Sequence, residues 1–190
     1  MEAVREINNP SISFRNRDGY SIILSTFSGR VNLSVFHKED KSQRGRGRSV
    51  QRITLNEVDL LYVRRIVDNM PSMSPETQKA LNIRTRNQES GNYEVVGAIC
   101  FGKDEKQVYY VELQFKKDGR SHSIRCETVM YSTLQPTEVD FSPAQASADG
   151  VSVMKWFLDT VVPLGMVCAN YKFEQDNNRG GGNNNNSPSF

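Results

Sequence analysis

Apolar and polar residues alternate along several short segments in the first third of the chain. The clearest is residues 30–38, where Val31, Leu33 and Val35 alternate with mostly polar neighbours. A period of two is typical of a strand with one buried face and one open face. The same pattern predicts three further strands, over residues 11–16, 20–27 and 50–55.

The period lengthens to that of a helix after residue 55. Asn56 is a favourable N-cap, and Glu57 and Asp59 place negative charge in the first turn. A broad apolar stripe follows, made of Leu60, Leu61, Val63, Ile66 and Val67. These features predict a helix that ends near residue 70, covering one face of the sheet and leaving the other face open.

A second unit of similar size follows the first. Strands are predicted over residues 93–101, 107–115 and 121–130, and a helix over 152–162 after a long connection. The inner side of that helix is expected to carry Val153, Trp156, Phe157 and Val161. The polar residues 71–91 predict a connecting loop, with at most a helical turn around residues 75–81.

The predicted fold class is therefore α+β, with two curved antiparallel sheets that are each backed by an α-helix. The expected parts are a sheet–helix half over 1–70, a connection over 71–91, a second half over 92–173, and a tail over 174–190. The tail is rich in Asn and Gly and predicts disorder, either as a solvated segment or as a docking tip for a protein partner. An oligonucleotide-binding barrel fits less well, because each half closes with a helix whereas that barrel is a continuous sheet.

The net charge of +2 hides an uneven distribution. Residues 1–52 contain 10 Lys and Arg against 5 Asp and Glu, whereas the remainder contains 14 against 17. Around the predicted loop over 39–49, a run without acids holds Lys41, Arg44, Arg46, Arg48 and Arg52. Spaced cations on a glycine-containing loop can follow a phosphate backbone, and guanidinium planes can stack on bases. A solvated basic loop is the alternative interpretation.

The open face of the predicted sheet is a second candidate surface. Phe36 is expected to project away from the core between cations, which suits stacking on a base. The residues assigned to this surface are Arg15, Arg17, Tyr20, Arg30, Asn32, Ser34, Phe36, Lys38 and Arg52. Tyr20, and with it Tyr110, could equally be packed at a sheet edge or subunit contact. Further cations cluster at a hairpin of the second half, as a solvated turn or as a continuation of the surface: Lys116, Lys117, Arg120 and Arg125.

The chain offers little that predicts catalysis. His37 and His122 have no metal-ligand spacing, and Glu112 and Asp159 stand without an evident partner. No nucleophile-elbow, zinc-protease or P-loop pattern occurs. We expect no catalytic residue, no metal and no cofactor.

The number and spacing of the cysteines indicate the redox state of the compartment in which the protein works. Cys100, Cys126 and Cys168 are odd in number and lack CxxC spacing, which favours a reducing compartment over a disulfide framework or zinc site. The N-terminus does not read as a signal peptide, and the longest apolar run, near residues 161–169, is too short to span a bilayer. We expect a cytoplasmic protein, or a nuclear one in a eukaryote, with no membrane partner.

Residues 20–70 resemble the single-strand-binding domain of the transcriptional coactivator positive cofactor four. The similar features are Phe27-Ser-Gly-Arg30, the strand of residues 31–35, the basic loop, and Ile53-Thr-Leu55-Asn56 leading into the helix. The resemblance implies a curved sheet backed by a helix, dimerisation, and binding to unpaired DNA. It further implies that Phe27 stacks on a base and that Arg30 contacts the backbone. The paired halves are similar to the related Whirly architecture, and bacteriophages encode proteins of this broad type.

Three hypotheses follow from these patterns. The first is a sequence-tolerant single-stranded DNA-binding protein of replication, recombination or transcription, as a homodimer or an internal pseudo-dimer. The second is an RNA-binding regulator on the same fold, since phosphate and stacking contacts serve either polymer. The third is a non-catalytic structural or assembly protein that uses the sheet face as a subunit interface.

Overall fold

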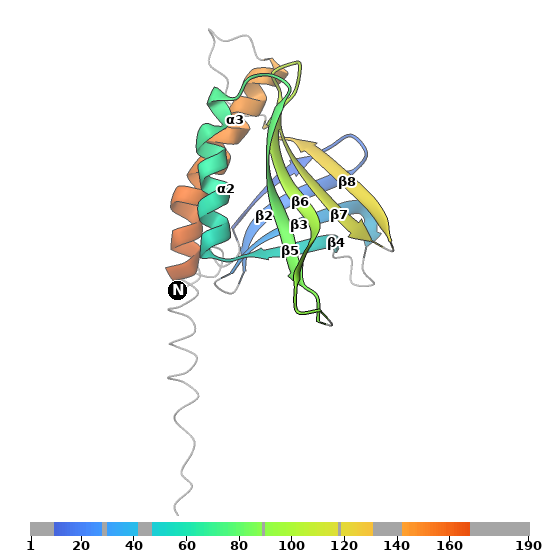
Figure 1. Ribbon diagram of the computed structural model, residues 1–190. Helices are drawn as coiled ribbons and strands as arrows, with labels where there is room; N and C mark the ends of the chain where they lie inside the picture. Colours follow the sequence, from blue (N-terminus) through green and yellow to red (C-terminus); the bar gives the residue numbers. More distant parts are fainter. Residues whose placement is uncertain are drawn as a thin grey trace, which may run out of the picture.

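The computed structural model describes residues 10–27, 30–41, 47–88, 90–117, 119–130 and 142–167. They form two four-stranded antiparallel sheets, each with its strands in sequential order, and each followed along the chain by a helix (Figure 1). The strands of sheet A are β1 Ser11–Arg15, β2 Tyr20–Phe27, β3 Arg30–Lys41 and β4 Gly47–Leu55. The strands of sheet B are β5 Thr77–Arg86, β6 Tyr93–Lys103, β7 Tyr109–Lys117 and β8 Arg120–Glu127. This arrangement confirms the predicted fold class.

The first helix, α2 (Glu57–Asn69), begins where its capping residues require. The Asn56 side chain accepts a hydrogen bond from the Asp59 backbone N–H at 2.9 Å, and the Asp59 carboxylate accepts one from the Asn56 N–H at 3.0 Å. This reciprocal pair satisfies two of the backbone donors that a helix start leaves without partners. A 3₁₀ turn over Met70–Ser72 then ends the helix at Pro71.

The second helix, α3 (Pro143–Trp156), continues through a π-helical turn over Phe157–Val161 into helical residues that extend to Val167. It lies antiparallel beside α2 (Figure 1), and ion pairs join the two helices. Arg64 Nε lies 2.9 Å from Asp159 Oδ1, and Lys155 bonds to Asp68. Asp159 was expected to have no partner, which is wrong. By length and composition the whole helix could cross a membrane, although here its apolar face packs into the protein core.

One apolar core connects both halves. Ile22 and Leu33 of sheet A, Phe101 of sheet B, Val63 of α2 and Met154 of α3 line a void of only about 10 Å³. The alternating residues predicted to face inward on β3 are all buried: Val31, Leu33 and Val35. The two sheets are in contact where β8 meets the start of β2: the Cys126 thiol lies 3.8 Å from the Tyr20 carbonyl oxygen, and the Asn16 side-chain amide donates to the Arg125 carbonyl oxygen at 3.1 Å. The two sheet–helix units are therefore halves of one packed body.

Several expectations about the elements are wrong. Residues 77–86, assigned to a loop, form strand β5, which pairs with β6 over ten residue pairs. The second helix begins at Pro143 rather than near residue 152. Trp156, assigned to its inner side, is 56% exposed, and Leu61 of the predicted α2 stripe is 51% exposed. The basic loop is also shorter than expected, because β3 runs to Lys41 and β4 begins at Gly47.

Candidate nucleic-acid interface

The outer face of sheet A is the surface on which most of the predicted site residues meet. It is defined by the strand positions that alternate with those facing the apolar core, and the cross-strand register aligns them in three rows. Two of these positions, Asn32 and Ser34, are themselves buried, so Ser34, contrary to expectation, is not on the open surface. The rows are Arg15–Ser21–Phe36–Ser49, Ser13–Ile23–Ser34–Arg52 and Ser11–Ser25–Asn32–Thr54. Arg30 continues β3 on the same side and pairs in register with Phe27. The serines of β1 and β2 were not predicted as site residues. They stand at alternate strand positions, so the same period of two would have placed them on this face.

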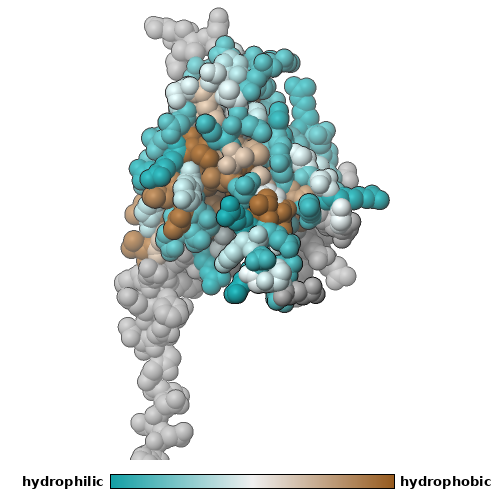
Figure 2. All heavy atoms as spheres, in the orientation of Figure 1, coloured by the Kyte–Doolittle hydropathy of each residue, from teal (hydrophilic) through white to brown (hydrophobic). Residues whose placement is uncertain are grey.

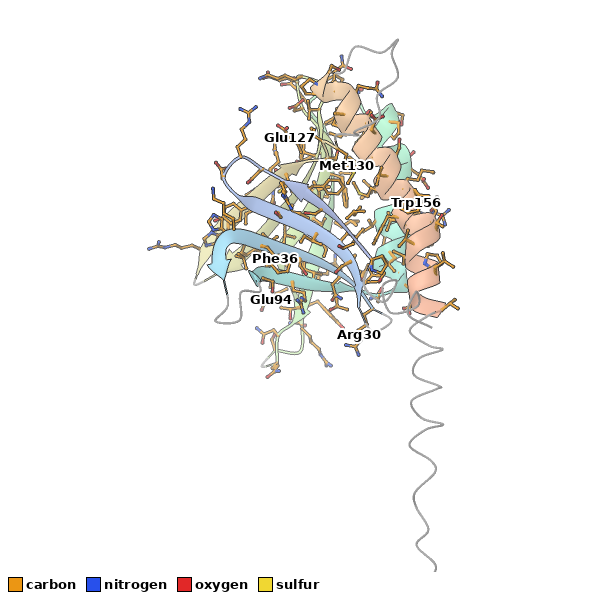
Figure 3. All side chains as sticks on the ribbon, turned by 180° about the vertical axis from the view of Figure 1, so that it is seen from behind. Arg30, Phe36, Glu94, Glu127, Met130 and Trp156 are labelled. Carbon is orange, nitrogen blue, oxygen red and sulfur yellow. The ribbon has the colours of Figure 1, made fainter. Side chains whose placement is uncertain are left out.

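This face combines cations with small hydroxyl side chains. Arg15, Arg30 and Arg52 are exposed, and none of the described residues of the three rows is acidic. Phe36 and Ile23 are half-buried, so each leaves part of an apolar side chain accessible between the serines. Figure 3 shows Phe36 on sheet A and Arg30 toward the end of the sheet nearest the helices. Such a face can attract phosphates and still contact bases.

Asn32 has a supporting role on this face. Its side chain is only 8% exposed, and its Oδ1 accepts a hydrogen bond from the Thr54 hydroxyl at 2.9 Å. Thr54 itself is exposed at the edge strand β4. The bond orients the hydroxyl, so Thr54 rather than Asn32 is the residue of this pair that a ligand reaches.

Tyr20 does not belong to the open face, contrary to expectation. It pairs in register with His37, and their ring centroids are 4.5 Å apart. Its side chain packs against the core cluster on the inner side of sheet A. The reason is register, because Tyr20 has the same parity on β2 as the buried Ile22 and Leu24.

Two further predicted cations lie at the end of the sheet near the β1–β2 turn. Gly19 in that turn has φ +87° and lies against the aliphatic stem of Lys38, whose backbone N–H donates to the Gly19 carbonyl oxygen at 3.0 Å. A Cβ at residue 19 would approach the Lys38 Cδ to 2.6 Å. Lys38 and Arg17 are both exposed. Because they lie at this end of the sheet, they border its outer face rather than forming its centre.

The basic loop can be located only in part. Lys41 and Arg48 have their backbones in β3 and β4, while the positions of their side chains, like Arg44 and Arg46 as a whole, lie outside the described residues. The same is true of the Phe27 side chain and of the tail. In sheet B, exposed Lys116 and Arg120 lie at the β7–β8 hairpin, where Lys117 pairs with Arg120. The hairpin cations therefore belong to the other sheet.

A polar cluster on the outer side of sheet B was not expected from the sequence. Glu112 accepts hydrogen bonds from Gln114 at 2.8 Å, from Ser123 at 2.7 Å and from Arg125 at 2.8 Å. Burial favours the neutral carboxyl, but these three donors and the charge of Arg125 outweigh it and lower the pKa of Glu112. The Arg125 guanidinium also covers the Tyr110 ring, 3.9 Å from its centroid. Tyr110 is buried, so it is no open stacking platform.

The described cysteines are internal. Burial raises the pKa of Cys126 to about 11 and also raises that of Cys100. Within the described part of the chain, no three His, Cys, Asp or Glu side chains are grouped so that they could hold a metal ion.

No family model matches the sequence, and no curated protein matches it. Among solved structures, the chain is similar to the crystal structures of trypanosoma bruciei MRP1/MRP2, with 7% identity and a TM-score of 0.47. That similarity covers 85% of this chain and 89% of the other.

Proposed function

We propose that the protein is a sequence-tolerant single-stranded DNA-binding protein that acts in replication, recombination or transcription. The observation that carries the proposal is the outer face of sheet A, which presents exposed arginines, a partly accessible Phe36 and no described acid. Phosphate contacts on such a face supply salt-dependent affinity, and stacking supplies contact with bases of any sequence. A flexible strand with unpaired bases fits both features, whereas a duplex hides its base faces.

The resemblance of residues 20–70 to positive cofactor four supports the same proposal, as does the resemblance of the paired halves to the Whirly architecture. In this proposal the role needs no catalytic group or cofactor, and the protein works in the cytoplasm or, in a eukaryote, in the nucleus. In this proposal the packed pair of sheet–helix halves acts as an internal pseudo-dimer, and a homodimer is the alternative.

The first test is the fluorescence anisotropy of a labelled oligothymidine, competed with matched duplex DNA and with an RNA oligomer across a range of salt. We expect tight binding that prefers single strands and weakens steeply as salt rises. A stronger preference for RNA would select the RNA-binding alternative. No binding at low salt would overturn the proposal.

The outer face of sheet A is tested by changing Arg15→Ala and Arg52→Ala together. Each lost phosphate contact lowers the slope of log affinity against log salt by about one, so we expect a decrease of about two and weaker binding. The matched control is Arg65→Ala with Lys106→Ala, which removes two exposed cations elsewhere and gives the same net charge. If both pairs behave alike, the affinity reflects overall charge and this face is not the site. If only the oligomeric state changes, the face is a subunit interface.

A further inference from the structure

A cleft of about 450 Å³ lies between β4 and β5, the edge strands of the two sheets. Its apolar walls include Ile53 from β4 with Leu81 and Ile83 from β5. Arg84 and Tyr93 also line it, from β5 and β6. The volume is within the range of sites that hold small organic ligands, which is enough for a nucleobase. In Figure 2 a small apolar group lies among hydrophilic residues over the strands on this side of the molecule.

Tyr93 is the most exposed aromatic residue among the large apolar side chains described, at 71%. It pairs in register with Arg86, and the next outward pair along the strands is Arg84 with Val95. Within the described residues, the Arg84 and Tyr93 side chains form no hydrogen bond or ion pair. An exposed aromatic ring beside two arginines offers a base-stacking surface and phosphate contacts together.

The cleft continues from the outer face of sheet A. Thr54 lines the cleft and also donates its hydroxyl hydrogen to Asn32 on that face. Because β4 is an edge strand, a ligand that crosses the three rows past Arg52 next reaches the cleft. The path leads from one cationic surface to another.

The chemistry of the cleft favours a base over a phosphate. Ile53, Leu81 and Ile83 make part of its wall apolar, and the carboxylate of Asp59 lies at the start of α2, where it would repel a phosphate group. Asn82 is exposed at the cleft and carries both an amide donor and an acceptor, the groups that pair with a base edge. Arg84 is exposed and can hold the backbone outside.

We propose that this cleft is a second nucleic-acid subsite, which takes an unstacked base from the strand bound on the outer face of sheet A. Tyr93 stacks on that base and Arg84 contacts its phosphate. The inference rests on the proposed function, because it needs a strand on the outer face of sheet A.

The test compares Tyr93→Ala, Arg84→Ala and the matched control Tyr62→Ala, whose ring is 50% exposed on α2. Tyr93→Ala should weaken oligothymidine binding about ten-fold at an unchanged salt slope, since stacking carries no charge. Arg84→Ala should lower the salt slope by about one, and Tyr62→Ala should change neither. Thermal melts followed by far-UV circular dichroism check that each variant folds. We expect all three to fold, because the side chains that are removed are exposed.

An abasic oligomer separates stacking from other effects. The affinity difference between the wild-type protein and Tyr93→Ala should vanish on an oligomer that lacks bases. Suppose that the wild-type protein binds oligothymidine and that the Arg15/Arg52 variant binds it more weakly. If Tyr93→Ala and Arg84→Ala then bind as tightly as the wild-type protein, only the cleft proposal is overturned. The cleft would then suit another partner, such as an extended peptide that pairs with the free edge of β5. If the wild-type protein does not bind at all, both proposals are overturned.

Discussion

At the scale of single residues, Glu112 shows how a buried charge is tolerated in this protein. The residue is only 6% exposed, and its two carboxylate oxygens accept hydrogen bonds from three donors on β7 and β8. A buried carboxylate is costly unless it is paired and hydrogen-bonded. Arg125, half-exposed itself, is the only cation among those donors, so the cluster depends on it most.

We predict that Arg125→Ala lowers the free energy of unfolding by about 1–3 kcal/mol, because Glu112 loses a charged donor. Arg120→Ala is the control: it removes an exposed arginine from the same strand and should change the value by less than about 0.5 kcal/mol. Urea unfolding at pH 7 measures both. Equal effects would show that Arg125 acts only as a surface charge.

The same cluster predicts a dependence on pH. The pKa of Glu112 in the folded protein lies below its ordinary value of 4.5, so the folded state binds this proton less readily than the unfolded chain. The resulting stabilisation is complete above pH 4.5 and is lost as pH falls through the folded pKa. Glu112→Gln should therefore lose less stability than the wild-type protein between pH 6 and pH 3 in urea titrations. Parallel curves for the two proteins would contradict this.

At the scale of elements, the contact between α3 and the segment after β8 depends on small residues. The Thr128 hydroxyl donates to the Ser147 carbonyl oxygen at 2.9 Å, and the Ser147 hydroxyl accepts from the Tyr109 N–H at 3.1 Å. Gly150 lies so close that a Cβ there would be 1.6 Å from the Thr128 carbonyl oxygen. The helix therefore needs glycine at this turn.

Gly150→Ala separates helix propensity from packing. Propensity alone favours alanine by about 1 kcal/mol, whereas the overlap with the Thr128 backbone forces the helix to shift. We predict a net loss of about 1–3 kcal/mol, measured by urea unfolding. Ser152→Ala, at an exposed position of the same helix, should be nearly neutral. A gain in stability for Gly150→Ala would show that the contact relaxes without cost.

Strand β5 shows why an edge element is difficult to predict. Most of its residues are exposed, and only Leu81 and Ile83 are partly buried apolar positions. Its polar composition indicated a loop, but β6 supplies hydrogen-bond partners along its whole length. Backbone pairing does not require apolar side chains, so the strand left little signal in the sequence.

At the scale of the whole molecule, the shared core joins the two halves. Residues of sheet A, sheet B and both helices belong to one cluster of buried apolar side chains. Two units that bury their faces against each other should unfold together. The unfolding of the chain therefore depends on the contact between the two halves, and not on the repeated order of sheet and helix along the sequence.

We therefore predict a single cooperative unfolding transition, in which far-UV and near-UV circular dichroism coincide across a urea titration. A fragment of residues 1–74 should remain largely unfolded, since Ile22, Leu33 and Val63 would lose their partners in sheet B and α3. Two separate transitions, or a folded fragment, would show that the halves are independent domains.

The sequence by itself determined the strands of sheet A, the start of α2 at Asn56, and the alternation that places Arg15, Arg30, Phe36 and Arg52 on one face. These features depend on local periodicity and capping, which the chain carries in its own order of residues. Only the tertiary structure decided that Trp156 is exposed and that Glu112 meets Arg125. The cleft between β4 and β5 belongs to the same group. Each depends on which distant element covers a side chain, and local patterns carry no information about that partner.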